Sequence, residues 1–318
     1  MYLKIGYDGR IMVETGPSVT EVLAERAACR RPWYNRGDNF KVGLVIEGGA
    51  MRGVISGGMA LGIGALGLIE AFDAIYGASA GSCAGAYLLS RQTKAVSIFW
   101  EDLCDRRFID LSRPLAGLPI VDIPYLAYTV MRKIKPLEWE KVADSPIPLH
   151  AFVSSATDAR AIDFCSFETQ EEVLDVLHWS CRLPLLAGMP IRVGNYHYTD
   201  GGVATGGVTV EAALADGCTH LLVLMSGGEE LASNPAASWI GFLMLKKEFP
   251  RLAAALLELE KRRRVVTEMI RNSGNITAIK ADPGQTRGIS SLENNRRKLA
   301  RGANEGYKAV VKHFSQAG

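Results

Sequence analysis

Ser79 has a glycine two residues before it and another two residues after it, Gly77 and Gly81. A mainly apolar run over 71–76 precedes this pattern, and a helix is expected to begin near Ser82. A nucleophile elbow needs this arrangement, because the chain turns so sharply from strand to helix that side chains at the flanking positions would collide. The hydroxyl would then lie at a helix N-terminus, where free N–H groups favour negative charge. The pattern predicts either a nucleophile for acyl transfer or an ordinary strand–helix turn.

A glycine-rich turn precedes the serine motif. An apolar run that is typical of a strand buried on both faces ends there, at Gly48 and Gly49. Ala50 follows directly, and Arg52 lies two residues further on. Such a turn lets backbone N–H groups converge on one point, which suits an oxyanion hole formed by Gly49, Ala50 and, after the serine, Ala80. The alternative for the turn is a tight strand–helix connection that binds no ligand. Arg52 either holds an anion or braces the loop by pairing with a carboxylate.

Asp200 is the third candidate, because it ends a β-rich segment and precedes two glycines, Gly201 and Gly202. An Asp-Gly-Gly sequence is usually only a turn. In a catalytic interpretation, the Asp200 carboxylate accepts the proton of Ser79, and the two glycines let the loop pack against the elbow. This motif alone does not decide between the two interpretations.

Together, and in this order, the three motifs resemble the bacterial branch of the patatin-like phospholipase family. The resemblance covers roughly residues 41 to 228, and residues 156–158 and 180–184 match further pieces of the family pattern. The elbow follows the glycine-rich turn by the length of one intervening helix, which agrees with that pattern. The resemblance implies a three-layer α/β/α fold with a mostly parallel central sheet, and a catalytic dyad of Ser79 and Asp200.

The resemblance also implies an oxyanion region at Gly48, Gly49, Ala50 and Arg52. Members of the family usually carry a third glycine at the position of Ala50. Alanine keeps the N–H group but disfavours a positive φ, so this departure bears on the geometry of the oxyanion hole rather than on the nucleophile.

A Ser-His-Asp triad would require a histidine close to Ser79. The five histidines of the chain are His150, His178, His197, His220 and His313. Only His197 and His220 lie near expected loops or strand edges, and the late His313 falls on a basic terminal helix. A carboxylate serves directly as the base when burial raises its pKa, so a dyad fits the sequence better than a triad.

We therefore expect a serine acyl hydrolase that acts on lipid acyl esters, either phospholipids or lysophospholipids, through an acyl-enzyme on Ser79. Two alternatives stay open. One is an acyltransferase, in which an alcohol or amine replaces water, and the other is a non-hydrolytic lipid-binding protein on the same scaffold. No cluster of His, Cys and Asp has metal-ligand spacing, so neither a metal nor a cofactor is expected.

The composition is that of a globular protein with one large core: 318 residues, 48% hydrophobic and 22% charged. A net charge of +2 is too small to indicate nucleic-acid binding. Six scattered cysteines without a C-x-x-C pair, and no secretory signal, favour a cytoplasmic protein with reduced thiols. The uncharged stretch 53–69 is short for a membrane span of about 20 apolar residues and is expected to form a buried helix over the sheet. The sequence leaves the oligomeric state open.

The chain divides into three expected segments. Residues 1–40 form an N-terminal extension, 41–228 a catalytic core of alternating strands and helices, and 229–318 a helical part packed on the core. Helical periodicity runs through 235–272 and returns near 291–314. The expected strands are 42–47, 72–77, 148–155, 161–166, 190–193, 196–199, 220–225 and 276–280.

Three segments are candidates for peripheral contact with a lipid surface. The first is a proline-punctuated, lid-like region at about 105–148, with apolar residues such as Leu115 and Leu118. The second would bind anionic headgroups or form a solvated helix end and linker. It comprises Arg26, Arg30, Arg31 and Arg36 with Trp33 and Tyr34. The third is an apolar stripe within 239–249, which is either a membrane contact or part of the core.

Overall fold

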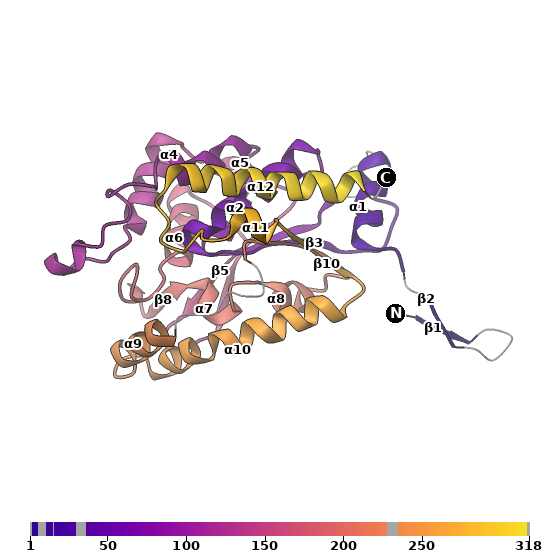
Figure 1. Cartoon of the computed structure of the whole chain (residues 1–318). Helices are drawn as coiled ribbons and strands as arrows, with labels where there is room; N and C mark the ends of the chain where they lie inside the picture. The colour runs from indigo at the N-terminus through magenta and orange to yellow at the C-terminus, as the bar shows by residue number, and fades with distance from the viewer. Residues whose placement is uncertain (1, 6–10, 15, 30–35, 228–234, 317–318) are drawn as a thin grey trace.

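The computed structural model describes residues 2–5, 11–14, 16–29, 36–227 and 235–316 (Figure 1). Side chains are described for 16–29, 36–227 and 238–316. The main body has three layers, a central sheet with helices on both faces (Figure 1).

The central sheet has eight strands and is mostly parallel. Its strands are β3 Val42–Ile46, β4 Ala74–Ala78, β5 Leu149–Ser155, β6 Ala161–Phe164, β7 Ile191–Val193, β8 Tyr196–Asp200, β9 His220–Met225 and β10 Ile276–Lys280. They lie in the order β10-β9-β3-β4-β5-β8-β7, and β6 pairs with β5. The first five of these are mutually parallel, whereas β6 and β8 run antiparallel to β5, and β7 runs antiparallel to β8.

Every expected strand is present, with ends shifted by at most two residues. β3, β4 and β9 are buried along their whole length, because helices cover both faces of a parallel sheet, and their sequences are accordingly apolar without alternation. β6 alternates between exposed and half-buried residues. A separate hairpin that the sequence analysis did not predict precedes the sheet, formed by β1 Tyr2–Ile5 and β2 Ile11–Glu14.

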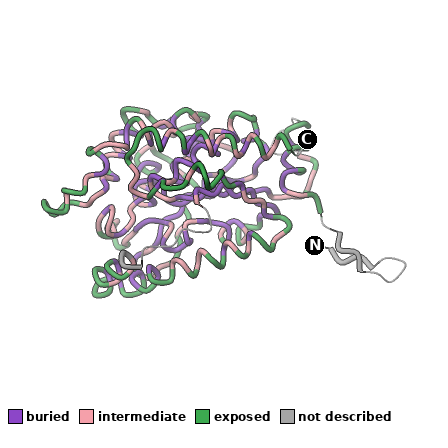
Figure 2. The backbone as a smooth tube through the Cα atoms, in the orientation of Figure 1, coloured by how far each residue is buried: buried purple, intermediate pink, exposed green. Residues whose placement is uncertain are grey.

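The helices lie on the two faces of the sheet (Figure 1). The α-helices are α1 Val19–Cys29, α2 Val54–Ala65, α3 Ala80–Leu89, α4 Ile98–Glu101, α5 Trp139–Ala143, α6 Gln170–Ser180, α7 Gly201–Thr205, α8 Val210–Ala215, α9 Pro235–Leu245, α10 Pro250–Asn272, α11 Pro283–Thr286 and α12 Arg296–Ser315. The 3₁₀ turns are η1 Ala50–Gly53, η2 Ile69–Ala71, η3 Thr93–Ser97 and η4 Arg113–Ala116, and η5 Tyr125–Ile134 is a π-helix. The largest apolar cluster lies on the face covered by α2, α3 and α12, and a second cluster lies on the face of α8 and α10. Figure 2 shows buried residues concentrated in the sheet and on the inward sides of these helices.

The uncharged stretch 53–69 forms the expected buried helix. Nine of the twelve residues of α2 are buried. Its glycines let α12 cross closely, since a Cβ on Gly58 would lie only 2.0 Å from the carbonyl oxygen of Ala303. Among the described residues, we find no helix with the length and apolar character that a bilayer crossing requires.

The helix α1 begins with a capping box at Ser18. The Ser18 hydroxyl accepts the N–H of Glu21 at 3.3 Å, and the Glu21 carboxylate accepts the N–H of Ser18 at 2.6 Å. Val19, Val22 and Leu23 are buried in the largest apolar cluster. The segment before the sheet therefore contributes side chains to the main core.

The arginines expected to meet headgroups or solvent are buried where the structure describes them. Arg26 binds the carboxylates of Asp38 and Asp73 at 2.7 and 2.8 Å. The guanidinium of Arg36 donates to the carbonyls of Ala71 and Phe72. Both interpretations are therefore wrong for these two arginines, whose charges hold α1 and the following loop to the start of β4. The remaining members, Arg30, Arg31, Trp33 and Tyr34, lie outside the described residues.

The helical periodicity of 235–272 divides into α9 and α10, because Pro250 begins a new helix and disfavours helical geometry at Phe249. The apolar stripe is divided as well. Leu245 and Phe249 are buried, whereas Trp239 and Leu243 are 56% and 54% exposed. The core interpretation therefore holds for the buried part of this stripe, and the membrane contact stays a prediction for the exposed part.

The proline-punctuated region 105–148 has a buried inner side and an exposed tip. A β-bridge between Ile109 and Val121 closes its base. Ile123 is buried, whereas Leu115 at the tip is 93% exposed.

Candidate active site

Ser79 lies at the turn between β4 and α3. Its φ of 56° and ψ of −134° are strained for any residue other than glycine. The flanking glycines make room for the turn, since a Cβ on Gly77 would lie 2.6 Å from the carbonyl carbon of Gly81. A Cβ on Gly81 would lie 2.1 Å from the carbonyl oxygen of Ile46. The segment therefore has the geometry of a nucleophile elbow.

The side chain of Ser180 holds the elbow in place. The backbone N–H of Ser79 donates to the Ser180 hydroxyl at 2.8 Å, and that hydroxyl donates to the carbonyl of Phe152 at 2.7 Å. The hydroxyl of Ser82 donates to the carbonyl of Ser79 at 2.7 Å. Sequence reasoning assigned Ser180 no role, although it lies in the segment 180–184 that carried part of the resemblance. The signal in the sequence that could have indicated this role is the position of Ser180, a polar residue at the end of a mainly apolar face of α6.

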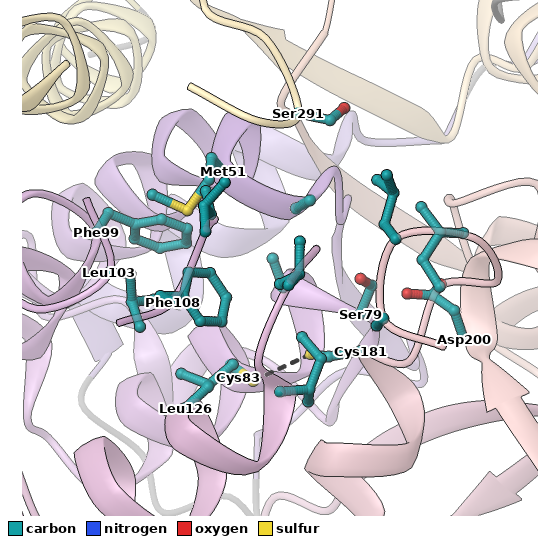
Figure 3. A pocket seen from close by; sticks show the side chains of 18 of the residues that line it. Met51, Ser79, Cys83, Phe99, Leu103, Phe108, Leu126, Cys181, Asp200 and Ser291 are labelled. Carbon is teal, nitrogen blue, oxygen red and sulfur yellow. Dashed lines mark hydrogen bonds between the residues drawn. The ribbon is translucent and has the colours of Figure 1, made fainter. Parts of the chain in front are cut away.

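The strands β4 and β8 occupy successive places on the same flank of β5. β4 pairs in parallel up to Ala78, which lies opposite Phe152, and then leaves the sheet at Ser79. β8 arrives from the opposite direction and pairs with Val153 at Asp200. Since β6 occupies the other flank of β5, β8 takes the place that β4 vacates. Ser79 and Asp200 thereby come together, and Figure 3 shows their side-chain oxygens facing one another.

Asp200 is only 3% exposed, and its carboxylate accepts the N–H of Gly202 at 2.8 Å. Burial raises the pKa of Asp200 from 3.8 to about 6, while the Ser79 hydroxyl and the Gly202 N–H oppose this effect by favouring the ionised form. The carboxylate is therefore ionised at neutral pH and able to accept a proton. A Cβ on Gly201 would lie 2.1 Å from the carbonyl oxygen of Phe152, so this glycine lets the turn lie directly on β5.

The glycine-rich turn packs beside the elbow. A Cβ on Gly48 would lie 2.6 Å from the carbonyl oxygen of Ala78, and the N–H of Gly48 donates to the carbonyl of Gly207 at 3.4 Å. Gly49 has a φ of 138° and Ala50 a φ of 51°, so Ala50 adopts the left-handed conformation that glycine favours. Within the described residues, neither Gly49 nor Ala50 donates its N–H to an acceptor.

The N–H of Ala80 completes the set of candidate oxyanion donors. Ala80 is the first residue of α3, so its N–H has no partner within the helix. Ala50, Ser79 and Ala80 all line the same pocket. Two of the three candidate donor residues therefore border the same pocket as the Ser79 hydroxyl, which is a condition for an oxyanion hole.

The guanidinium of Arg52 lies over Gly49, since a Cβ on that glycine would lie 3.3 Å from the nearer Arg52 nitrogen. Its Nε is buried without a hydrogen-bond partner, and no described carboxylate forms an ion pair with it. Burial lowers the pKa of Arg52, and the nearby cation Arg263 acts in the same direction, whereas Glu47 opposes both. Glu47 is instead paired with Arg263. The loop-bracing interpretation of Arg52 thus lacks its expected ion pair in the described part of the chain.

An apolar pocket of about 590 Å³, counting the space at its open mouth, extends from the serine (Figure 3). Ser79 and Asp200 lie at one end, beside Cys83 and Cys181, whose sulfurs are 3.6 Å apart. Most of the remaining wall is aliphatic or aromatic, and it includes Met51, Phe99, Phe108, Ile109, Ile123 and Leu126. Several of these residues come from the inner side of the region 105–148. That region therefore forms part of the pocket wall.

None of the five histidines lines this pocket or bonds to Ser79 or Asp200 in the described structure. The two that the sequence placed near loops have other contacts. The ring of His197 lies against Phe249, and His220 faces the carbonyl of Pro17 at 3.1 Å. The pocket thus offers a carboxylate and no imidazole as the neighbour of the serine.

A three-layer α/β/α fold with an elbow serine after a parallel strand defines an α/β class of acyl hydrolases. The family model for patatin-like phospholipases matches residues 44–214, just over half of the chain. The chain therefore belongs to the patatin-like phospholipase family, a family of lipid hydrolases, and the resemblance carried by its motifs is confirmed.

Comparison with solved structures finds a similarity to VipD from Legionella pneumophila. The two share 15% sequence identity and superpose with a TM-score of 0.46, covering 88% of this chain and 67% of that one. No curated protein matches the chain.

Proposed function

We propose that this protein hydrolyses acyl esters of lipids, phospholipids or lysophospholipids, through an acyl-enzyme on Ser79 with Asp200 as the general base. The observation that carries the proposal is an elbow serine beside a buried carboxylate, whose pKa is about 6, at the polar end of an apolar pocket. Membership of the patatin-like phospholipase family supports a lipid ester as the substrate class.

In the first half-reaction, the Ser79 Oγ attacks the ester carbonyl carbon while its proton passes to the Asp200 carboxylate. The former carbonyl oxygen becomes negative, and the N–H groups of Gly49, Ala50 and Ala80 stabilise it by about 3–4 kcal/mol per donor. The intermediate then breaks the bond to the leaving alcohol, which takes the proton from Asp200. Water attacks the acyl-enzyme, gives a proton to Asp200, and releases the fatty acid as Ser79 recovers that proton.

Arg52 would add a positive charge next to these donors. Among the described residues, Arg52 has no ion-pair partner, and its Nε is buried. A guanidinium whose charge is not neutralised by an ion pair stabilises an anion more strongly than a paired one. The anion would be the oxyanion of the intermediate or the phosphate of a phospholipid. The apolar wall of the pocket would hold the acyl chain, since burying methylene groups there removes them from water.

The exposed tip of the region 105–148 would contact the lipid surface. Leu111, Leu115 and Leu118 are 72%, 93% and 56% exposed. Neighbouring exposed leucines are unfavourable in water and are typical of a surface that contacts lipid or another protein. The arginines around the tip are each paired with an aspartate, as in Arg113 with Asp122. Contact would therefore depend on shallow insertion of leucines more than on attraction to anionic headgroups.

Lipid acyl profiling of the full chain tests the proposed function. Native protein and Ser79→Ala are incubated with vesicles of phosphatidylcholine, phosphatidylglycerol and lysophosphatidylcholine, and released fatty acid is quantified. Native protein should release fatty acid and Ser79→Ala none, and a fluorophosphonate should label Ser79 alone, as located by mass spectrometry.

An added alcohol distinguishes hydrolysis from acyl transfer, because both pass through the same acyl-enzyme. A product in which the alcohol carries the acyl group would reassign the protein as a transferase. Binding of vesicles without fatty acid release or fluorophosphonate labelling would contradict the proposal and favour the non-hydrolytic alternative.

A further inference from the structure

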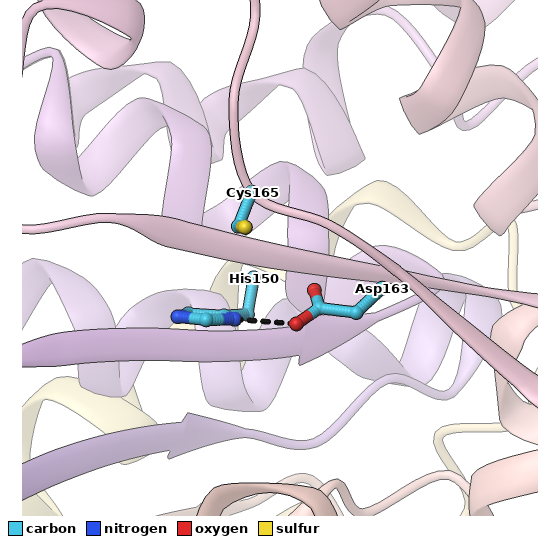
Figure 4. Close-up of side chains that lie close together, drawn as sticks. All are labelled: His150, Asp163 and Cys165. Atoms are coloured by element: carbon cyan, nitrogen blue, oxygen red, sulfur yellow. Dashed lines mark hydrogen bonds and ion pairs between the residues drawn. The ribbon is translucent and has the colours of Figure 1, made fainter. Parts of the chain in front are cut away.

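His150 on β5, Asp163 on β6 and Cys165, one residue beyond β6, lie together outside the pocket (Figure 4). Each offers one atom that can bind a metal ion, and these three atoms all lie within 4.8 Å of one another. The nitrogen, oxygen and sulfur donors face the same small space. The reaction proposed for Ser79 uses none of them.

The register of the two strands explains why the three side chains meet. β5 and β6 are antiparallel, with Ala151 opposite Phe164, so the same register places His150 opposite Cys165. Directly opposite residues have Cβ atoms about 4.5–5.5 Å apart. Asp163 lies two residues before Cys165 and therefore projects from the same face of the sheet. Such a group cannot be seen as a spacing in the sequence, which is why no metal site was expected there.

The imidazole of His150 is held in a fixed orientation. It is 8% exposed and stacks on the ring of Tyr76, with centroids 4.5 Å apart and planes at 19°. Its Nδ1 lies 2.6 Å from the Asp163 carboxylate (Figure 4), and its Nε2 lies 3.6 Å from the carboxylate of Asp216. Asp216 is itself fixed by the hydroxyl of Tyr76 and the ammonium of Lys41.

We propose that His150, Asp163 and Cys165 form a binding site for a divalent metal ion of borderline softness, zinc above all. An imidazole nitrogen, a thiolate and a carboxylate are the protein ligands that Zn²⁺ takes, at about 2.0–2.3 Å in a tetrahedron whose fourth position is filled by water. The His150 Nδ1 faces the metal position. The Asp216 carboxylate lies 3.6 Å from the Nε2, on the side from which a carboxylate orients a ligating histidine.

Binding replaces protons by the metal ion. The Nδ1 of His150 must be unprotonated and Cys165 must be a thiolate, so the thiol proton and any proton shared between His150 and Asp163 leave to solvent. The side chains of Asp163 and Cys165 are accessible, which provides the entry path for the ion. The bound metal ties β6 to β5, the strand on whose other flank Ser79 and Asp200 meet.

Titration of the full chain with Co²⁺, a spectroscopic substitute for Zn²⁺, tests the proposal. One equivalent should produce the visible absorption of four-coordinate cobalt together with a thiolate-to-cobalt charge-transfer band in the near ultraviolet, and Zn²⁺ should abolish both. Cys165→Ser should lose the charge-transfer band. Asp163→Asn should weaken binding, and Asp216→Asn should weaken it by about 10- to 100-fold.

The matched control is Cys29→Ser, which removes another exposed cysteine and should leave the spectrum unchanged. Ser79→Ala should also bind cobalt normally, so the outcome is independent of the proposed esterase activity. A charge-transfer band that survives Cys165→Ser would overturn the proposal. A folded native chain that shows no saturable cobalt spectrum would overturn it equally.

Discussion

Ser79 and Asp200 reach the same flank of β5 from two strands that run in opposite directions. Ser79 leaves the sheet one residue after Ala78 pairs with Phe152, and Asp200 enters it opposite Val153, the next residue of β5. A single strand thus sets the separation of hydroxyl and carboxylate. Changes that shift β5 should therefore affect catalysis without touching either residue.

Ser79→Ala and Ser79→Gly should both be inactive but should differ in stability. The φ of 56° at this position strains any residue with a Cβ, and only glycine relieves that strain. Glycine loses more backbone entropy on folding, which offsets part of this gain. We therefore expect Ser79→Gly to be about 1 kcal/mol more stable than Ser79→Ala. Urea unfolding of the two variants measures the difference. Equal stabilities would mean that the elbow is not strained in solution.

Asp200→Asn should lower kcat by orders of magnitude, because the amide cannot accept the proton of Ser79. In the native protein, kcat/KM should rise with pH through about 6 and then level, as the buried carboxyl of raised pKa ionises. The apparent pKa of this limb should change little with temperature, as for a carboxyl group. A strong temperature dependence, or abolished turnover in a folded His197→Ala or His220→Ala variant, would indicate an imidazole base instead.

Asp200→Asn should also stabilise the fold at neutral pH. The folded protein holds the Asp200 proton more tightly than the unfolded chain, so the free energy of unfolding falls as pH rises from 3.8 to about 6. This pKa shift lowers the free energy of unfolding by about 3 kcal/mol above pH 6. Asp200→Asn avoids this loss and still accepts the N–H of Gly202. Its advantage in unfolding free energy should be largest above pH 6 and disappear near pH 4.

Ser180→Ala should impair catalysis through the elbow. The variant leaves the buried N–H of Ser79 without its acceptor, which costs about 1–3 kcal/mol of stability. We expect kcat to fall by about tenfold or more with little change in KM, because the nucleophile is displaced while the pocket is intact. Ser90→Ala is the control, since Ser90 is equally buried and, within the described structure, its hydroxyl bonds only to the carbonyl of Tyr87. A similar loss of kcat in both variants would indicate a general effect on folding.

Ala50→Gly should maintain or raise kcat. The N–H that would bind the oxyanion is kept, and glycine removes the strain of a φ of 51°, about 1 kcal/mol. Steady-state kinetics on a soluble ester, together with urea unfolding, measures both effects. A large fall in kcat would show that the Ala50 methyl group, which lines the pocket, positions the substrate.

Replacing the tip leucines should affect vesicle substrates selectively. Leu115→Asp with Leu118→Asp should lower activity on phosphatidylcholine vesicles and leave the hydrolysis of a short soluble ester unchanged. Leu257→Asp on α10 is the control, because Leu257 is also exposed but lies outside the tip. Raising the salt concentration should have little effect, since the arginines around the tip are paired with aspartates. Equal losses on both substrates would place the tip in the catalytic reaction itself.

The local features of this protein could be predicted from its sequence. An uninterrupted apolar run predicts a doubly covered strand, and glycines on both sides of Ser79 predict a tight turn, because both depend only on neighbouring residues. The strands of the central sheet were therefore predicted to within two residues, and the glycine-rich turn, the elbow and the Asp-Gly-Gly turn were each recognised.

Contacts between distant parts of the chain could not be predicted from the sequence. Ser180 binds the elbow across 101 residues of sequence, Arg26 is buried through its pairing with Asp38 and Asp73, and Cys165 faces His150 through strand register. Such contacts depend on which strands and helices pack together, and this is set by burial of the whole apolar core rather than by local pattern. The sequence does not show whether a basic cluster or a single cysteine faces solvent or contacts another side chain, because that side chain comes from a distant part of the chain.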